Sequence, residues 1–434
     1  MQSNENAFAR SKYALQIAIR PWYSLTPESQ RYPMPEPRPL TLLCITTYEK
    51  GQEFMRECKR RGCRVLLLTA EKLRDADWPR ESLQDMFYLP AELPLADIVK
   101  AVTHLARSEK IDRIVALDEY DMETASTLRE HLRVPGMGLT TMRYFRDKLA
   151  MRMRALDRGL RVPDFVPVFH PEDIRYYLEH VAGPWVLKPR QEASAIGIKK
   201  ILLADELWPI LEQLGEKQSA YLLEKFVPGE VYHVDSVVSE NEVVFANVSK
   251  YGKPPMNVAQ AGGVFTTFTV PRGGQADTGL RQINRDLIAA LGLVRGVAHA
   301  EFIQAHADGN FYFLECAARV GGAYINEMVE AATGVNLWRE WARLEIAGED
   351  ATYQLPPERE EYAGVILSLA RQDDPDTSAY NDPEVFLRIQ RHHHAGLILR
   401  STDPERVPAL LENYAQRFAQ EFLAVEPPRE KPTA

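Results

Sequence analysis

The stretch that decides the fold is His299-Ala-Glu-Phe-Ile303, followed by Phe311-Tyr-Phe-Leu-Glu-Cys-Ala-Ala-Arg-Val-Gly-Gly322. Asp308-Gly309-Asn310 between the two pieces is a turn signal, and the apolar flanks predict the two strands of a β-hairpin. Such a hairpin would place Glu301 and Glu315 side by side on neighbouring strands. Adjacent buried carboxylates repel each other unless a cation lies between them. Hard oxygen ligands of this kind suit Mg²⁺, which also takes substrate phosphates as ligands, so the hairpin predicts a magnesium site beside a phosphate.

Length and composition indicate a soluble globular protein. The chain has 434 residues, with 45% hydrophobic and 26% charged residues, which favours two or three domains. Its net charge is −9 and its longest basic cluster is Lys-Arg-Arg at 59–61, which argues against nucleic acid or an anionic membrane as partner. No apolar run reaches the length of a membrane span, and the polar N-terminus lacks a signal core. Four cysteines are too few for a disulfide framework, so we expect a cytoplasmic setting.

The first third of the chain predicts an N-terminal arm and a parallel sheet. Prolines at 33, 35, 37 and 39 indicate an extended arm over residues 1–39. Strands predicted at 40–46, 64–69 and 113–117 alternate with helices at 52–61 and 94–108, the pattern of a helix-covered parallel sheet. Asp118, Glu119 and Asp121 follow the third strand, where ligands bind in such sheets. A helix N-cap with first-turn acids explains the same residues, and both interpretations stay open.

The rest of the chain alternates helices and strands less regularly. We expect helices at 140–160, 205–214, 277–291, from about 324, and at 404–422. We expect strands at 183–189, 199–203, 221–227, 231–238, 242–248 and 364–370. We expect residues 427–434 to form a disordered C-terminal tail.

Two lysines and one loop are candidates for binding phosphate. Lys148 follows Arg146-Asp, although an exposed helix lysine would look the same. Lys188 stands in Val186-Leu-Lys-Pro189, between apolar strand residues, and buried lysines are rare unless paired with an anion. The loop after it, up to Gly197, has small residues that let backbone amides approach phosphate oxygens. It lacks the Gly-Lys-Ser/Thr ending of a Walker loop.

The segment Leu223-Glu-Lys-Phe-Val-Pro-Gly-Glu230 suits a nucleoside. Its apolar backbone offers a carbonyl and an amide to an adenine ring, and Glu230 suits a ribose diol. The alternative is an ordinary strand with exposed Glu224 and Lys225.

In this order the motifs resemble the ATP-grasp superfamily. They are Arg146-Asp-Lys with Met151 after it, Gly159 to Pro163, Val186-Leu-Lys-Pro189 with its small-residue loop, Leu223 to Glu230, Ala300-Glu-Phe, and Leu314-Glu-x-x-x-Arg-x-Gly-Gly322. The resemblance covers roughly Asp118 to Trp338. It implies an α/β chain: a flavodoxin-like parallel-sheet domain at 40–139, then a two-lobed α+β ATP-grasp domain at 140–338. The lid lobe would lie within 140–230 and the central lobe within 231–338, and 339–426 would complete the large lobe.

The resemblance also implies a role for each motif residue. Lys148 and Lys188 would hold the phosphates of ATP, with Lys188 acting in catalysis. Ser194, Ala195, Ile196 and Gly197 would form a mobile lid. Glu224, Lys225, Phe226 and Val227 would contact the adenine and Glu230 the ribose. Glu301 and Glu315 would bind Mg²⁺ or Mn²⁺, and Arg319 would anchor the substrate carboxylate or steady an acyl phosphate, because a guanidinium grips two oxygens at once. Gly321 and Gly322 would let the substrate approach the backbone.

One departure from the family pattern concerns the metal site. Many members carry a metal-binding asparagine where this chain has Ala317, and Asn326 is a candidate replacement. The pattern without that asparagine resembles amino-acid ligases and carnosine-synthase-like enzymes. It implies an ATP-dependent carboxylate–amine ligase that works through an acyl phosphate on small molecules, with an amino acid among them, and a homodimer is a family-level expectation. The alternatives are a biotin-carboxylase-like carboxylation, weakened by the lack of a Met-Lys-Met carrier segment, and a degenerate nucleotide-binding regulator.

Three other candidates stand apart from these motifs. His392-His-His394 could bind a metal, but adjacent residues on a strand alternate faces and cannot all reach one ion. His233 and Asp235 share one strand face and could line the site or form a satisfied polar pair. Cys316 is expected to point to the core.

Overall fold

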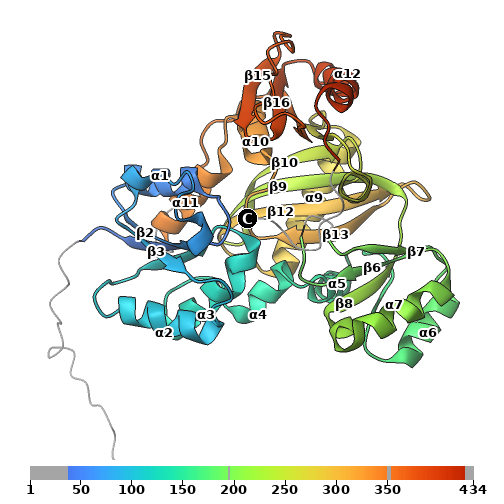
Figure 1. Ribbon diagram of the computed structural model, residues 1–434, viewed down its shortest axis with the longest axis horizontal. Coiled ribbons are helices and arrows are strands. Elements are labelled where there is room, and N and C mark those ends of the chain that lie inside the picture. Colours follow the sequence, from blue (N-terminus) through green and yellow to red (C-terminus); the bar gives the residue numbers. More distant parts are fainter. Residues whose placement is uncertain (1–37, 194–195, 349–352, 426–434) are drawn as a thin grey trace, which may run out of the picture. The chain divides into compact units, whose positions relative to one another are not determined.

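A computed structural model of the chain describes residues 38–193, 196–348 and 353–425. Most of the predicted arm at 1–39, the predicted tail at 427–434, and the lid residues Ser194 and Ala195 therefore lie outside the described residues. The described part contains three β-sheets, two of four strands and one of eight (Figure 1).

The first sheet is parallel and four-stranded. Its strands are β1 (Thr41–Thr46), β2 (Arg64–Ala70), β3 (Asp85–Leu89) and β4 (Arg113–Ala116), in the order β3-β2-β1-β4. The helices are α1 (Gln52–Arg60), α2 (Leu95–Leu105) and α3 (Met122–Leu132). Alternate residues of β1 enter different cores: Leu43 packs with α2 and α3, whereas Leu42 packs with α1. The predicted helix-covered parallel sheet is confirmed, and edge strand β3 adds a strand that the sequence pattern did not reveal.

The second sheet is small and antiparallel. Its strands are β5 (Phe165–Pro167), β6 (Trp185–Pro189), β7 (Lys199–Ile201) and β8 (Tyr221–Lys225), in the order β5-β8-β6-β7. Helices α6 (Pro171–His180) and α7 (Leu207–Leu214) pack on it through a separate apolar core. The single helix predicted at 140–160 is wrong: it divides into α4 (Leu139–Met142) and α5 (Lys148–Asp157). The break occurs because the Asp147 carboxylate caps α5 by accepting from the Leu149 amide at 3.0 Å.

The third sheet is antiparallel and eight-stranded, in the order β13-β12-β9-β10-β11-β14-β16-β15. Its strands are β9 (Gly229–Ser239), β10 (Glu242–Tyr251), β11 (Phe265–Thr269), β12 (Gly296–Ala305), β13 (Phe311–Ala317), β14 (Tyr362–Leu369), β15 (Val385–Arg391) and β16 (His394–Ser401). The helices are α8 (Pro255–Ala261), α9 (Gln275–Leu291), α10 (Ile325–Thr333), α11 (Leu337–Ala347) and α12 (Arg406–Glu421). The strands after residue 339 thus join the same sheet as the β12–β13 hairpin.

Helices cover both faces of the large sheet. Leu280 and Leu287 of α9 pack into the core that also holds Phe302 and Phe313 of the hairpin. Met328 of α10 and Trp341 of α11 pack into the core shared with α1, so α11 lies between the large sheet and α1. Short 3-10 turns complete the chain at Glu71–Leu73, Arg80–Ser82, Glu119–Asp121, Arg143–Phe145, Ala204–Glu206 and Gly215–Ala220.

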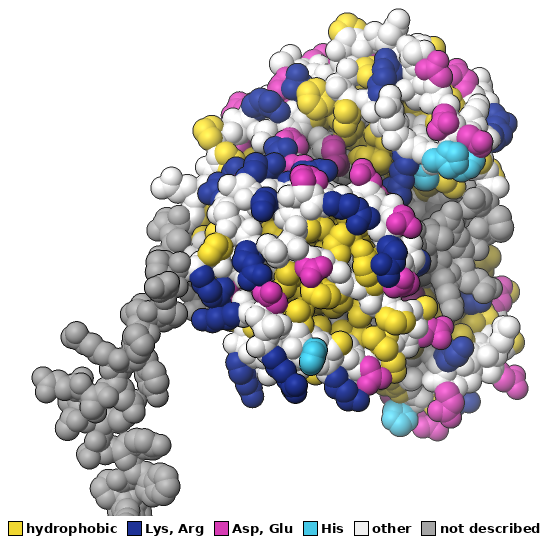
Figure 2. Space-filling model, turned by 60° about the vertical axis from the view of Figure 1, so that its left-hand side comes forward, with side chains coloured by type: hydrophobic (Ala, Val, Ile, Leu, Met, Phe, Trp, Pro, Cys, Tyr) yellow, Lys and Arg dark blue, Asp and Glu magenta, His cyan; other side chains and the backbone are white. Residues whose placement is uncertain are grey.

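The surface over the parallel sheet carries charges of both signs. Figure 2 turns this side toward the reader and shows Lys and Arg interspersed with Asp and Glu around an exposed hydrophobic area. Among the described helices, none has the length and apolar character needed to cross a membrane.

Candidate active site

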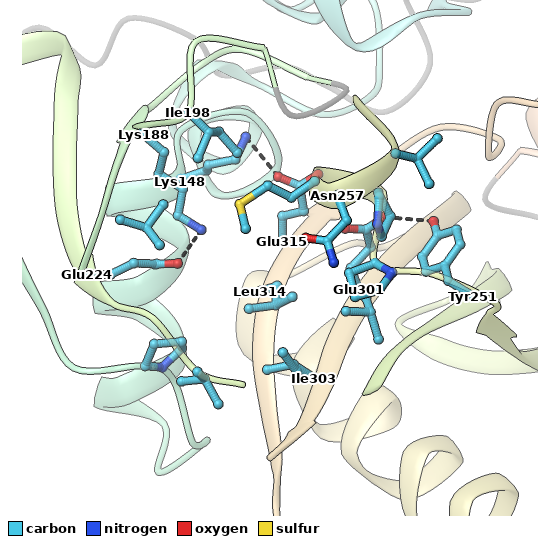
Figure 3. A pocket seen from close by; sticks show the side chains of 18 of the residues that line it. Lys148, Lys188, Ile198, Glu224, Tyr251, Asn257, Glu301, Ile303, Leu314 and Glu315 are labelled. Atoms are coloured by element: carbon cyan, nitrogen blue, oxygen red, sulfur yellow. Dashed lines mark hydrogen bonds and ion pairs between the residues drawn. The ribbon is translucent and has the colours of Figure 1, made fainter. Parts of the chain in front are cut away.

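The predicted motifs meet around one cavity of about 590 Å³, between the small sheet and the hairpin end of the large sheet (Figure 3). That volume falls in the usual range for small-molecule sites. The predicted residues that line it are Lys148, Lys188, Ile196, Glu224, Lys225, Phe226, Val227, Glu301, Glu315, Arg319 and Gly322. Segments spread over more than 170 positions of sequence therefore converge as predicted.

The β12–β13 hairpin is confirmed, and it pairs Glu301 directly with Glu315. Gly309 makes the turn with a φ of 71°. The ladder slips by one residue next to Glu301, so Leu314 has no partner across the hairpin. A bulge of this kind re-aims side chains. Leu314 and Glu315 accordingly both line the cavity, although neighbours on a regular strand face opposite sides.

The two hairpin carboxylates fit a divalent cation. The Lys148 ammonium lies 2.8 Å from Glu315 Oε2, and the Tyr251 hydroxyl donates to Glu301 Oε1 at 2.7 Å. The other oxygen of each carboxylate has no hydrogen-bond partner among the described residues. Burial disfavours the charged form, but the nearby imidazole of His299 and the hydrogen bond from Tyr251 hold the pKa of Glu301 below its usual value. Two charged carboxylates with one free oxygen each are the hard donor set that Mg²⁺ or Mn²⁺ prefers.

Both candidate phosphate lysines are buried at the cavity. Lys148 is not an exposed helix lysine, since only 7% of it is exposed and its ammonium also donates to the Glu192 carbonyl at 2.6 Å. Lys188 extends from the small sheet and forms a close ion pair with Glu224. Burial lowers the pKa of Lys188, and the Glu224 charge opposes that effect. Two ammonium groups and the two hairpin carboxylates thus line the same cavity, and Lys148 contacts Glu315 there (Figure 3).

Glu224 is held between two cations. Besides Lys188, its carboxylate accepts from Arg152 Nε at 3.1 Å, and Arg152 is fully buried. Burial would raise the pKa of Glu224, but the charges of Arg152 and Lys188 keep it below its usual value. The alternative of an ordinary strand with an exposed Glu224 is therefore wrong. Its predicted adenine contact stays a prediction.

Of the other residues predicted to bind the nucleoside, some line the cavity and Glu230 does not. Lys225, Phe226 and Val227 line the cavity. Glu230 is not among its lining residues and instead lies 3.0 Å from Lys250 Nζ and 3.6 Å from His306 Nε2. The predicted ribose contact of Glu230 stays a prediction.

The loop after Lys188 is fastened at its start. The Ala193 amide donates to the Tyr120 hydroxyl at 3.2 Å, which ties the loop to the end of the parallel sheet. Further along, Ile196 lines the cavity and Gly197 takes a φ of 71°. Of the predicted lid, these two residues are described, and its closure stays a prediction.

Arg319 reaches the cavity from the turn after the hairpin, and Glu119 of the parallel-sheet domain holds it. Glu119 Oε1 accepts from Arg319 Nε at 3.0 Å and from Arg319 Nη2 at 2.5 Å. Arg146 Nη1 lies 3.5 Å from the other Glu119 oxygen. Burial would raise the pKa of Glu119, but the charges of Arg319 and Arg146 lower it to about 2. The guanidinium predicted to bind the substrate is therefore positioned by a carboxylate 200 residues earlier.

The other two acids after the parallel sheet have structural roles. Asp118 accepts from the Tyr120 amide at 3.1 Å, as a helix N-cap does, and it pairs with Lys50. Asp121 accepts from the Thr47 amide at 2.9 Å. The capping interpretation therefore holds for Asp118, whereas Glu119 holds Arg319 and its ligand-side interpretation stays a prediction.

Two predictions around the metal site need correction or refinement. Asn326 cannot replace the missing asparagine ligand, because it is buried and its side-chain oxygen accepts from the Leu337 amide at 2.8 Å. Gly322 lines the cavity but Gly321 does not. A Cβ atom on Gly321 would lie 3.0 Å from Asp235 Oδ1 and 3.0 Å from His299 Nδ1, so a side chain there would be tightly packed and glycine is favoured.

The three outlying candidates have different outcomes. His233 and Asp235 form a satisfied buried pair at 2.6 Å, as one of the two interpretations proposed. Cys316 is fully buried in the core, as expected. The triple histidine does not follow strand alternation, because His392 and His393 form a turn and lie with Asp373 on the exposed surface, away from the cavity.

Sequence reasoning missed several residues that complete the site. His299 precedes Glu301 by two positions, so the period of a strand could have placed both on one face. Arg152 and Tyr251 come from distant elements, and their sequence surroundings carry no signal of their partners. Arg146 belongs to a motif quoted above, but its pairing with Glu119 was not predicted. The residues of α8 that line the cavity, Met256 among them, likewise lack any motif.

Comparisons with known proteins bear on the family. No family model matches the chain. An L-arginine-specific L-amino acid ligase of Bacillus subtilis is 26% identical over 242 residues, which is 54% of this chain and 58% of that protein. A D-alanine–D-alanine ligase of Cupriavidus taiwanensis is 27% identical over 223 residues, covering 49% of this chain and 67% of that protein. The match thus spans less than two thirds of the length of the arginine-specific ligase.

Solved structures show the same fold. The L-amino acid ligase of Bacillus licheniformis superposes with a TM-score of 0.70 at 19% identity, over 90% of this chain and 99% of that one. The N5-carboxyaminoimidazole synthetase of Staphylococcus aureus, complexed with ADP, gives a TM-score of 0.67 at 16% identity, over 87% and 96%. With the hairpin carboxylates and the two lysines gathered at one cavity, these likenesses lead to one conclusion: the chain has the ATP-grasp fold and is similar in sequence to amino-acid ligases.

Proposed function

We propose that the protein is an ATP-dependent carboxylate–amine ligase that forms an amide bond through an acyl phosphate and releases ADP and phosphate. We further propose that one substrate is an amino acid. The likeness to an L-amino acid ligase and to D-alanine–D-alanine ligases supports this choice over other reactions on the same fold. The proposal keeps the division into a domain at 40–139 and a nucleotide-binding part at 140–338, with a homodimer as its expected assembly.

The observation that carries the proposal is the grouping of two ammonium groups and two carboxylates at one cavity. Lys148 and Lys188 present ammonium groups, and Glu301 and Glu315 present carboxylates, at one cavity with room for a small ligand. A carboxylate attacks a terminal phosphate only when the repulsion between two anions is neutralised. Lysines on one side and a cation held by the carboxylates on the other would supply that neutralisation.

Each group has a distinct task in this scheme. Glu301 and Glu315 would hold Mg²⁺ or Mn²⁺, which neutralises phosphate charge when bound. Lys188 and Lys148 would contact the phosphates, and Lys148 would exchange its bond to Glu315 for one to phosphate oxygen. The backbone and apolar side chains at 226–228 would hold the adenine. Arg319, fixed by Glu119, would bind the acid substrate or the acyl phosphate made from it.

The reaction then has two steps. The substrate carboxylate takes the terminal phosphoryl group of ATP, so the oxygen–phosphorus bond to ADP breaks and an acyl phosphate forms. The amine attacks the acyl carbon, phosphate leaves, and the amine gives up one proton. Water must be excluded between the steps, because it would hydrolyse the acyl phosphate. The predicted lid after Lys188, which includes Ile196 at the cavity, would cover the cavity between the steps.

An assay of ADP release with pairs of amino acids tests the proposal. We expect release that depends on two amino acids, and hydroxylamine should trap the acyl phosphate as a hydroxamate. Bicarbonate alone should not support release. Chelating the divalent metal with EDTA should stop turnover, and added Mg²⁺ should restore it.

Two substitutions with matched controls locate the activity. Glu315→Gln and Lys188→Ala should each lower turnover by about a hundredfold or more, since each removes a charge that stabilises the transferred phosphoryl group. Glu216→Gln and Lys217→Ala make the same chemical changes on exposed side chains of a distant turn and should leave turnover unchanged. Full turnover in Glu315→Gln or Lys188→Ala, or ATP binding with no turnover for any substrate pair, would overturn the proposal.

A further inference from the structure

We infer that Tyr251, supported by a buried cluster of His233, Asp235 and His299, is a positioning residue that fixes the carboxylate of Glu301 for metal binding. The inference rests on the proposed function of the hairpin carboxylates as metal ligands. It concerns how this chain holds one of those ligands in place.

The cluster is built around Asp235 in the middle of β9. Its two carboxylate oxygens each meet one imidazole: His233 Nδ1 lies 2.6 Å from Oδ2, and His299 Nδ1 lies 2.9 Å from Oδ1. Burial would raise the pKa of Asp235, but the two histidines hold it well below its usual value. An ionised carboxylate only accepts hydrogen bonds, so both imidazoles donate from Nδ1 and their ring orientations are set.

The cluster is anchored at its far end. His233 Nε2 lies 2.7 Å from the hydroxyl of Thr267 on β11, and that hydroxyl also donates to the Lys250 carbonyl at 3.0 Å. His233, Asp235 and Thr267 are fully buried. The support therefore crosses three neighbouring strands of the large sheet, where side chains have little freedom.

At its near end the cluster reaches the metal ligand. His299 Nε2 lies 3.6 Å from Glu301 Oε1 and 3.5 Å from the Tyr251 hydroxyl. The Tyr251 hydroxyl donates to the same Glu301 oxygen at 2.7 Å (Figure 3). The Tyr251 ring is itself held by His233, with ring centroids 4.8 Å apart, and by Phe265 at 5.8 Å.

These contacts involve one oxygen of Glu301 and leave the other available to a metal ion. Oε1 receives Tyr251 and faces His299, whereas Oε2 has no hydrogen-bond partner among the described residues. Partners of this kind orient a metal-ligating carboxylate, and removing one typically weakens metal binding by about 10- to 100-fold. Among the described residues, Glu315 has one polar partner, the ammonium of Lys148.

The cluster itself is a poor metal site. The ligand atoms of His233, Asp235 and His299 lie within 4.8 Å of one another, as a metal site would require. Both Nδ1 atoms, however, carry protons that Asp235 accepts, so neither offers a lone pair. The Gly321 backbone also lies close by, since a Cβ atom there would be 3.0 Å from both Asp235 Oδ1 and His299 Nδ1.

Binding of Mn²⁺ with saturating ADP, followed by calorimetry, tests the inference on the intact protein. Tyr251→Phe keeps the packed ring and removes the hydroxyl, so the dissociation constant for Mn²⁺ should rise about 10-fold. Asp235→Asn should produce a similar rise by releasing the imidazoles. Affinity for ADP without metal and the midpoint of thermal unfolding of Tyr251→Phe should stay close to wild type.

Tyr232→Phe is the matched control. Tyr232 is also a buried tyrosine of the large sheet, but its hydroxyl lies 3.3 Å from Gln304 and makes no contact with Glu301. Its affinity for Mn²⁺ should equal that of wild type.

The outcomes separate the inference from the proposed function. If wild type with ADP does not bind Mn²⁺, the proposed function of the hairpin fails and the inference fails with it. If wild type binds Mn²⁺ and the Tyr251→Phe affinity is unchanged, the inference alone fails. Should Tyr251→Phe not fold, the folded Asp235→Asn protein decides. Loss of a second bound Mn²⁺ in Asp235→Asn would instead identify the cluster as a metal site and overturn the positioning role.

Discussion

Replacing Glu119 with glutamine should destabilise the protein by about 3 kcal/mol and release Arg319 from its present position. The substitution keeps the size of the side chain and one acceptor oxygen, but it removes the charge that faces Arg319 and Arg146. Both members of the Glu119–Arg319 pair are buried, with 10% and 14% of their side chains exposed, so water screens the loss only weakly.

The magnitude follows from the pKa of Glu119, which falls from its ordinary value of 4.5 to about 2. At about 1.4 kcal/mol for each pH unit, the folded state favours the charged carboxylate by about 3 kcal/mol. The lowered pKa means that this stabilisation is fully present above pH 4.5 and is lost as the pH falls toward 2. With an unfolding entropy of roughly 0.9 kcal/mol/K for a chain of this length, the midpoint should fall by roughly 3 to 4 °C at pH 7.

Thermal unfolding at pH 7 and pH 3 provides the assay. Glu123→Gln is the control, because Glu123 is an exposed acid four residues further along the same segment. The difference in unfolding midpoint between Glu119→Gln and wild type should be largest at pH 7 and smaller at pH 3. The midpoint of Glu123→Gln should stay near that of wild type. Equal midpoints for Glu119→Gln and Glu123→Gln at pH 7 would refute the reasoning that an ion pair positions Arg319.

The remaining predictions concern packing. Gly321→Ala should lower the free energy of unfolding by about 1 to 3 kcal/mol, because its Cβ would press on Asp235 and His299, and chemical denaturation measures this loss. Gly322→Ala is its control, since a Cβ there meets nothing within 4 Å, and an equal loss in both variants would contradict the packing argument. All four cysteines are buried free thiols and should react with a thiol reagent only after denaturant is added; rapid labelling of the native protein would show that the core opens.

The elements with strong local patterns could be predicted from sequence. The hairpin of Glu301 and Glu315 combines two apolar runs with an Asp-Gly-Asn turn, so both its existence and its pairing could be read correctly. The alternation of strands and helices likewise revealed the parallel sheet. Edge strand β3 was missed because its pattern is short and its residues are partly exposed, so its apolar periodicity is weak.

Contacts between distant segments could not be predicted in the same way. The pairing of Glu224 with Arg152, and that of Glu119 with Arg319, depends on how sheets and helices pack, and residue type alone does not choose one partner among many. For Asn326 the sequence led to a wrong prediction, that of a metal ligand. Its side chain suited a metal, but the fold uses it to bond the start of α11, a local demand that the motif pattern could not show.

The bond between Glu119 and Arg319 has a consequence for protein engineering. A chimera that joins the first 120 residues of a relative to the remainder of this chain would transplant one half of a matched pair. Such a hybrid would keep every residue that faces ligand and still misplace its guanidinium, unless an acid arrived at the position of Glu119. The N-terminal domain therefore cannot be exchanged without regard to the rest of the chain. Libraries of recombined sequences should keep Glu119 and Arg319 together.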